Sequence, residues 1–152
     1  MAGFETELLN YVIKNGTVRY SELAKKFKKT SPAIYAAIKR LKQKKILLGI
    51  YPKIDLSKFG YDFTAFILIK VDQKNIPALL KKYGEQKDIT SIYEVSGEFD
   101  LLFIARLKST KELYTIVEEL TKDEKVAGID THIAYTTFKE GLNPWPLTEK
   151  EP

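Results

Sequence analysis

The chain has 152 residues, of which 44% are hydrophobic and 30% are charged, and its formal net charge is +5. This length and composition suit one domain or two small ones with packed cores, and they exclude a disordered chain. The chain has no cysteine and a single histidine, which excludes disulfides, a thiol nucleophile and any familiar zinc site, so no metal is expected.

Charge is divided unevenly along the sequence. The first 55 residues hold twelve of the 25 basic residues and four of the 20 acidic ones, which leaves thirteen basic and sixteen acidic residues for the remainder. The N-terminal third therefore has a net charge of about +8 and the rest about −3. Such a split indicates that the N-terminal part binds a polyanion.

Three helices are predicted in the basic third. Apolar residues at helical spacing predict the first over residues 4–14, and Gly16 suits the left-handed position after its end. The second is predicted over 22–27 with Ser21 as its N-cap. The third begins after a cap at Thr30 or Ser31. Its inward face repeats at i, i+4 and i+7, at Ile34, Ile38 and Leu41.

Residues 46–54 have a strand-like, mixed pattern. Because they follow a three-helix unit, we predict a wing and a connecting strand there. The charge balance changes near 55–60, which favours a domain boundary at that point. We expect the following divisions of the chain: a winged helix-turn-helix domain at 1–46, a connection at 47–60, a second domain at 61–141 and a C-terminal tail at 142–152. The tail has three prolines and is expected to be loosely held, apart from docking of Trp145.

The second domain alternates between strand and helix patterns. Strands are predicted over residues 61–72, 89–96, 101–107 and 129–139, and helices over 76–83 and 110–122. The order β-α-β-β-α-β is that of the ferredoxin-like arrangement, so the whole chain is predicted to be an α+β protein. The first strand is apolar on both faces, although the helices of such a sheet cover one face only. The second face needs a partner, and we infer at least a homodimer.

The third helix carries the pattern of a DNA recognition helix. Such a helix has small or polar side chains at its N-terminal end, because the backbone must enter the major groove. Lys25, Lys26, Lys28 and Lys29 lie beside the turn that precedes it. The alternative is a solvated basic face on a three-helix scaffold. The predicted DNA-contacting residues are Thr30, Ser31, Pro32, Ala33, Tyr35, Ala36, Lys39 and Arg40.

Five segments carry a resemblance to a known family. They are ELAKKF, TSPAIYAAIKRL, KKILLGIYPKIDLSKFGY, YEVSGEFDLLFIARL and VAGIDTHIAYTTFKEG, in this order. The chain resembles the Lrp/AsnC regulators, also called leucine-responsive or feast/famine proteins. The resemblance implies a winged helix-turn-helix domain and a ferredoxin-like domain that dimerises through its sheet, then often forms tetramers or octamers. It also implies an amino acid effector bound between dimers.

The resemblance implies effector contact at the turn Gly97, Glu98, Phe99 and Asp100. A glycine in a tight turn exposes N–H groups that suit a carboxylate, and an aspartate suits an ammonium group. The simpler interpretation of this turn is a hairpin. The chain departs from the family pattern at three positions. Lysines stand at 28 and 45, where the family has a small residue, and Ala134 stands where it has a threonine. His132 neighbours Ala134 on the same strand face. We interpret it as an ordinary interface histidine, and the alternatives are a polar effector contact or a pH sensor.

These patterns together predict a sequence-specific DNA-binding transcription regulator that responds to a small metabolite, an amino acid, without a cofactor. Two alternatives stay open: an architectural DNA-binding protein without an effector, and a ferredoxin-like small-molecule sensor or enzyme. The enzyme is disfavoured because the chain lacks a Gly-rich phosphate loop and has one histidine. The N-terminus lacks a signal-peptide pattern and the longest apolar stretch is too short for a bilayer, so a cytoplasmic, nucleoid-associated protein without a membrane partner is expected.

Overall fold

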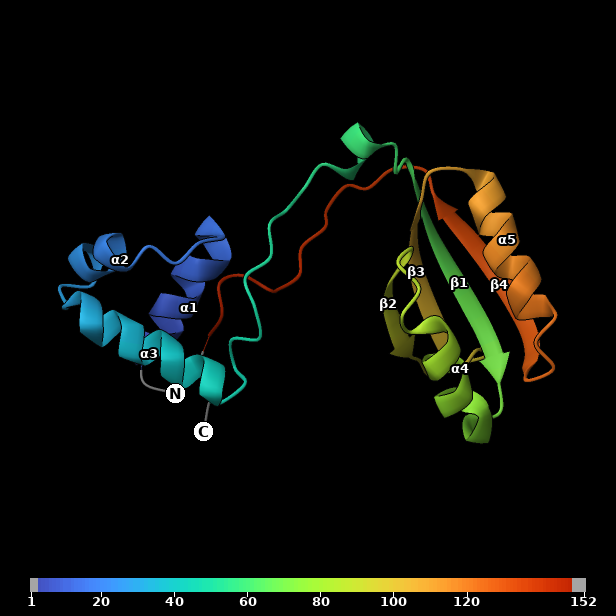
Figure 1. The fold of residues 1–152 in the computed structure, drawn as a ribbon, viewed down its shortest axis with the longest axis horizontal. Coiled ribbons are helices and arrows are strands. Elements are labelled where there is room, and N and C mark those ends of the chain that lie inside the picture. The colour runs from blue at the N-terminus through green and yellow to red at the C-terminus, as the bar shows by residue number, and fades with distance from the viewer. Residues whose placement is uncertain (1–2, 149–152) are drawn as a thin grey trace. The chain divides into compact units, whose positions relative to one another are not determined.

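The computed structural model describes residues 3–148, and the chain divides into two compact units (Figure 1). The first, here the helical unit, contains the chain up to Ile54 and the segment from Lys139 onward. The second, here the sheet unit, is Asp55–Phe138. The C-terminal tail thus returns to the helical unit, and its last four residues lie outside the described range.

Three helices form the helical unit: α1 (Gly3–Asn15), α2 (Tyr20–Lys26) and α3 (Ser31–Gln43). Thr30 caps α3 as predicted, since its Oγ1 accepts a hydrogen bond from the Ala33 N–H at 3.3 Å. The prediction of Ser21 as the cap is wrong, because α2 begins at Tyr20, two residues before the predicted start, and Arg19 occupies the cap position without a side-chain hydrogen bond. The predicted inward residues of α3 are all buried.

Two lysines of the helical unit have left-handed backbone conformations. Lys28, after α2, has φ +51°, and Lys45, after α3, has φ +54°. The turns are closed by backbone hydrogen bonds, such as the one from Lys29 N–H to the Ala24 carbonyl at 2.9 Å. A side chain in this region costs about 1 kcal/mol, which glycine avoids. The lysines at 28 and 45, where the resemblance implies a small residue, therefore occupy strained backbone positions.

The strand predicted over residues 46–54 does not form. This segment is extended coil in the described structure, and no strand ladder reaches it within residues 3–148. A strand exists only with a hydrogen-bonded neighbour, which a single chain does not supply here. Leu48 and Tyr51 are left 80% and 66% exposed. The wing was therefore a wrong prediction for the single chain.

The sheet unit has the predicted β-α-β-β-α-β order. Its elements are β1 (Phe63–Val71), α4 (Ile76–Tyr83), β2 (Ile89–Glu94), β3 (Leu101–Leu107), α5 (Thr110–Thr121) and β4 (Val126–Ala134). The strands are antiparallel in the order β2-β3-β1-β4. The last strand begins and ends earlier than the predicted 129–139. Its ladder stops where Ala134 faces Thr64, because β1 begins at Phe63 and offers no partner beyond.

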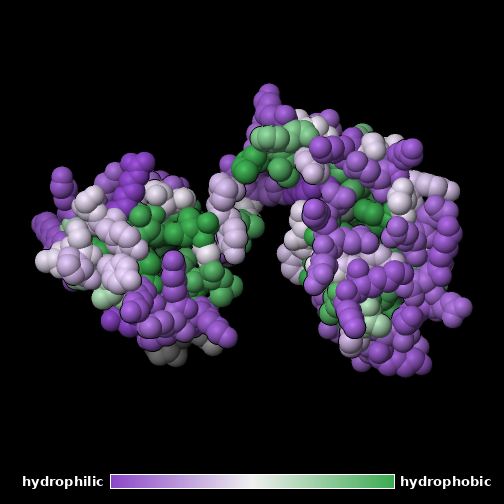
Figure 2. Space-filling model, viewed as in Figure 1, coloured by the Kyte–Doolittle hydropathy of each residue, from purple (hydrophilic) through white to green (hydrophobic). Residues whose placement is uncertain are grey.

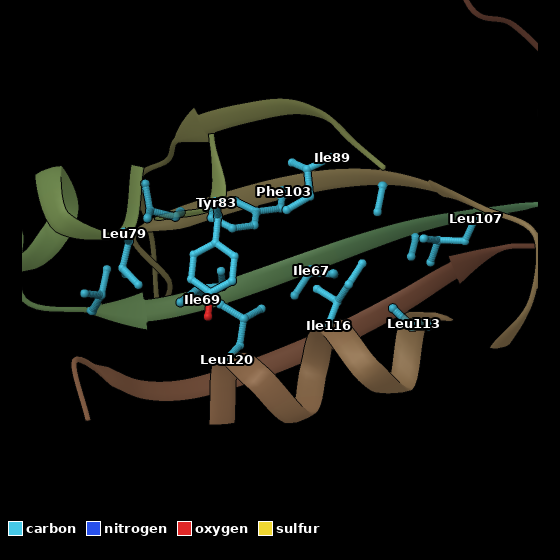
Figure 3. Close-up of a cluster of buried hydrophobic side chains, with 14 residues drawn as sticks. Ile67, Ile69, Leu79, Tyr83, Ile89, Phe103, Leu107, Leu113, Ile116 and Leu120 are labelled. Carbon is cyan, nitrogen blue, oxygen red and sulfur yellow. The ribbon is translucent and has the colours of Figure 1, made fainter. Parts of the chain in front are cut away.

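The two faces of the sheet differ in their cover. Ala65, Ile67 and Ile69 of β1 are fully buried against the layer of α4 and α5 (Figure 3). Thr64, Phe66 and Leu68 alternate with them and point to the other side. On the neighbouring strand β3, Ile104 lies opposite Phe66 and Leu102 lies opposite Leu68. We call this second surface the open face, and its apolar centre consists of Phe66, Leu68, Leu102 and Ile104.

Further apolar surface is exposed where the sheet unit begins. A short 3-10 helix, η1 (Leu56–Phe59), precedes β1, and Phe59 is 63% exposed. In Figure 2 this segment forms part of the hydrophobic surface at the top of the view. Together with the open face, it leaves the isolated chain with apolar surface that a partner would cover.

Candidate DNA-binding face and effector site

Helix α3 and its N-cap residue Thr30 present all eight predicted DNA-contacting residues to solvent. Its opposite side is buried in the core of the helical unit. A helix that is apolar on one side and small or basic on the other is free to lie in a groove while its core side holds it. The exposed residues are Thr30, Ser31, Pro32, Ala33, Tyr35, Ala36, Lys39 and Arg40.

An aromatic pair spans α2 and α3. The Tyr20 and Tyr35 rings lie 5.7 Å apart at an interplanar angle of 55°. Tyr35 is nevertheless 54% exposed, so its ring is supported on one side and open on the other. The sequence analysis named Tyr35 as a predicted DNA contact and did not name its neighbour Tyr20. An aromatic residue at the exposed start of α2 was its only signal.

Arg40 has a structural contact that the sequence did not reveal. Its Nε donates a hydrogen bond to Glu5 Oε1 at 2.7 Å and so joins α3 to α1. The Glu5 side chain is 7% exposed and the Arg40 side chain 52%. Arg40 therefore neutralises a buried carboxylate, and its contact with DNA stays a prediction.

The lysines beside the turn do not all serve one surface. Lys26 Nζ lies 5.4 Å from the Tyr11 ring centre, and Lys29 Nζ lies 4.7 Å from that of Phe4. Both rings belong to α1, so these two ammonium groups lie against that helix. Lys39, in contrast, stands on the exposed face of α3. It is the lysine best placed to contact DNA together with the small residues at the helix start.

The turn predicted to hold the effector is a closed loop between β2 and β3. The Val95 N–H donates to the Asp100 carbonyl at 2.9 Å, and Gly97 has φ +121°, which a side chain rarely adopts. The Asp100 carboxylate accepts the Val71 N–H through Oδ2 at 2.8 Å. Asp100 thus continues the hydrogen bonding at the end of β1, in addition to any role toward an ammonium group. Glu98 is exposed and Phe99 is half-buried.

His132 and Ala134 lie on the open face, as their alternation predicted. His132 is opposite Phe66 on β1, and its Nε2 is 3.0 Å from Asp130 Oδ2. The Asp100 carboxylate instead meets Val71, which is roughly 16 Å further along β1 at ~3.3 Å per residue. The two groups of predicted effector residues are therefore not brought together in one chain.

Two cavities of the described residues lie away from the predicted effector positions. One, of about 400 Å³, is lined by residues of α1 and α2 and by Trp145. The other, of about 480 Å³, lies between α5 and β4. Within residues 3–148, no three His, Asp or Glu side chains are grouped for a metal ion. No helix in that range is both long enough and apolar enough to cross a membrane.

Comparison with known proteins finds a matching family model and several relatives by sequence. The model of the Lrp/AsnC ligand binding domain matches residues 64–144, more than half of the chain. An uncharacterized HTH-type transcriptional regulator of Pyrococcus furiosus is 30% identical over 142 residues, covering 93% of this chain and 96% of its own. The regulator FL11 of the same organism is 26% identical, with 90% of each chain covered.

Solved structures agree with the fold. Escherichia coli AsnC superposes with a TM-score of 0.81 at 21% identity, over 92% of this chain and 95% of its own. A Neisseria meningitidis regulator in complex with L-Met superposes with a TM-score of 0.85 at 14% identity, over 93% and 94%. The relatives matched by sequence are transcriptional regulators, not enzymes.

Proposed function

Because the chain belongs to the Lrp/AsnC family of HTH-type transcriptional regulators, we propose that it recognises a specific operator through α3 and responds to a small metabolite, an amino acid. The observation that most supports operator recognition is the exposure of every predicted contact residue on α3 while the opposite side is buried. The basic N-terminal third supplies attraction to phosphate groups, so binding should weaken steeply with salt.

The proposed regulator acts as a homodimer formed through the open face. Its four apolar side chains lie at the centre of a sheet whose other side is covered by helices. A second copy of the same face is self-complementary under two-fold symmetry. Two copies of α3 would then contact successive major grooves, about 34 Å apart. Tetramers or octamers would follow from further contacts between dimers.

The proposed effector site spans more than one subunit. Asp100 and its loop lie at one end of β1, and His132 and Ala134 lie beside its first half. A pocket that uses both groups would need residues from two copies of the chain. Effector binding would then favour one assembly over another by its different affinity for the two.

Replacing Lys39 with Ala is expected to weaken operator binding by about 1–3 kcal/mol and to relax base preference, if Lys39 reaches a base edge. If it contacts only phosphate, affinity should fall evenly across sequences and the salt slope should decrease by about one. The measurement is fluorescence anisotropy with an operator selected from random DNA, over a salt series. Lys111→Ala, an exposed lysine of α5 on the helix-covered side of the sheet, is the control. Unchanged preference and salt slope would remove Lys39 from the interface.

Asp100→Asn should separate two roles of this residue. The amide oxygen can still accept the Val71 N–H, so we expect a melting temperature near that of the wild type. The negative charge is lost, so calorimetric titration with the twenty amino acids should detect no binding if Asp100 holds the ammonium group. Asp100→Ala should also lose about 1–2 kcal/mol of stability, because the Val71 N–H loses its acceptor. An Asn variant that binds the amino acid like the wild type would move the ammonium site elsewhere.

An architectural protein without an effector is the second candidate. Ala134 supports it, because the hydroxyl found at this position in the family is missing, and so does the separation of the predicted effector residues in one chain. Silence of the wild type toward all twenty amino acids, with intact DNA binding, would favour this candidate.

A further inference from the structure

The C-terminal segment, residues 139–148, is held on the helical unit through Asn10 of α1. The Leu147 N–H donates to Asn10 Oδ1 at 2.6 Å, and the Leu147 carbonyl accepts from Asn10 Nδ2 at 2.9 Å. One amide side chain thus satisfies both backbone groups of a residue 137 positions away. Such a two-bond arrangement fixes the segment in one register.

Apolar contact accompanies these hydrogen bonds. The Leu147 side chain packs against the buried cluster that α1, α2 and α3 share. Lys14 Nζ lies 5.3 Å from the Trp145 ring centre, and this ring forms one wall of the cavity of about 400 Å³ whose other walls include Tyr11 and Phe27. Hydrogen bonds, core packing and a cation–π contact therefore meet on one face of α1.

We infer that this face of α1 is a docking site for the chain's own C-terminal segment, and that the docked segment is a second tether between the two units. The first tether is the coil that follows α3. The second starts at the end of β4, where Ala134 stands, and reaches Leu147 within thirteen residues. With both tethers in place the helical unit has fewer orientations available than with one.

The consequence for regulation rests on the proposed function. Two half-sites on DNA are bound together only if the two α3 helices have the right separation. The docked segment would narrow the range of separations, and it is continuous with the strand that carries His132 and Ala134. A ligand that shifts the end of β4 would therefore change how strongly the C-terminal segment docks on α1. The protein would have two states, with this segment docked or released, and the ligand would favour one of them.

Docking is tested in the full-length protein with Trp145, the chain's single tryptophan, as the reporter. Leu147→Asp should shift its emission toward that of tryptophan in water and raise acrylamide quenching severalfold. Asn10→Asp is an isosteric change that loses the donor to the Leu147 carbonyl. It should change the emission and the quenching of Trp145 in the same direction, but less than Leu147→Asp does. Leu142→Asp, at an 81% exposed position outside the cluster, is the control. Circular dichroism checks that the helices persist.

Unchanged emission and quenching in both Leu147→Asp and Asn10→Asp would overturn the docking. The tether is tested with operators whose two half-sites are moved apart by added base pairs. The wild type should discriminate between spacings, and Leu147→Asp should lose this discrimination severalfold while binding a single half-site equally well. A released segment with unchanged spacing preference would overturn the tether. Failure of the wild type to bind any selected DNA would instead refute the proposed function and leave the fluorescence result intact.

Discussion

Replacing Phe66 with Glu is expected to convert the assembled protein into monomers. Phe66 stands in the middle of the open face, between Ile104 of β3 and His132 of β4. In a two-fold dimer through this face, every substitution occurs once in each copy and so alters the interface twice. A carboxylate at this place would be removed from water, and His132 beside it already pairs with Asp130. Burial of an unpaired charge costs at least about 3 kcal/mol, which weakens dimerisation more than about 100-fold.

Sedimentation velocity over a range of protein concentrations measures this result. Tyr114→Glu is the matched control, because Tyr114 is an aromatic residue of α5, 67% exposed, in the layer on the other side of the sheet. The Phe66 variant should retain its far-UV circular dichroism, since its side chain lies outside the buried cluster. It should also bind an operator with the affinity of a single half-site. Wild-type sedimentation of the variant would exclude the open face as the dimer interface.

Local patterns in the sequence were sufficient for most of the elements. Helical spacing in α3 and α5, with a cap at Thr30 for α3, predicted helices that the structure confirms. Alternation in β1 correctly predicted one face against the helices and one open face. These signals are local, because a cap or a periodic face depends on residues within a few positions of each other.

Where the sequence failed, the missing information was a contact between distant residues. The end of β4 depends on where β1 begins, so periodicity alone extended the strand beyond Ala134. The effector residues were grouped by motif, yet only the strand register reveals that Asp100 and His132 lie far apart on one sheet. Docking of Trp145 was expected, but nothing near Leu147 in the sequence indicates Asn10 as its partner.

The same limitation applies to Arg40, which the sequence assigned to DNA alone. Its partner Glu5 is 35 positions away, and a Glu in the first turn of α1 looks like an ordinary solvated residue. The structure instead buries Glu5 and pairs it with Arg40. A substitution at Arg40 therefore affects two properties at once: the packing of α3 on α1 and any contact with DNA.

Arg40→Ala is expected to reduce the stability of the helical unit by about 1–3 kcal/mol and to weaken DNA binding with it. The loss arises because the Glu5 carboxylate stays buried without its hydrogen-bond donor. The loss of stability is modest because the Arg40 side chain is 52% exposed and water screens the pair. Thermal unfolding and anisotropy with the selected operator measure the two effects separately.

The double variant Glu5→Gln/Arg40→Ala distinguishes the two roles of Arg40. The glutamine at position 5 carries no charge, so the double variant no longer buries an unpaired carboxylate. Its stability should therefore recover in part, although the guanidinium of Arg40 is still absent. If DNA affinity recovers together with stability, Arg40 serves to hold α3 against α1. If stability recovers and affinity does not, the guanidinium contacts DNA itself. We expect the second result, because Arg40 follows Lys39 on the exposed side of α3 and carries donors beyond the Nε that Glu5 binds.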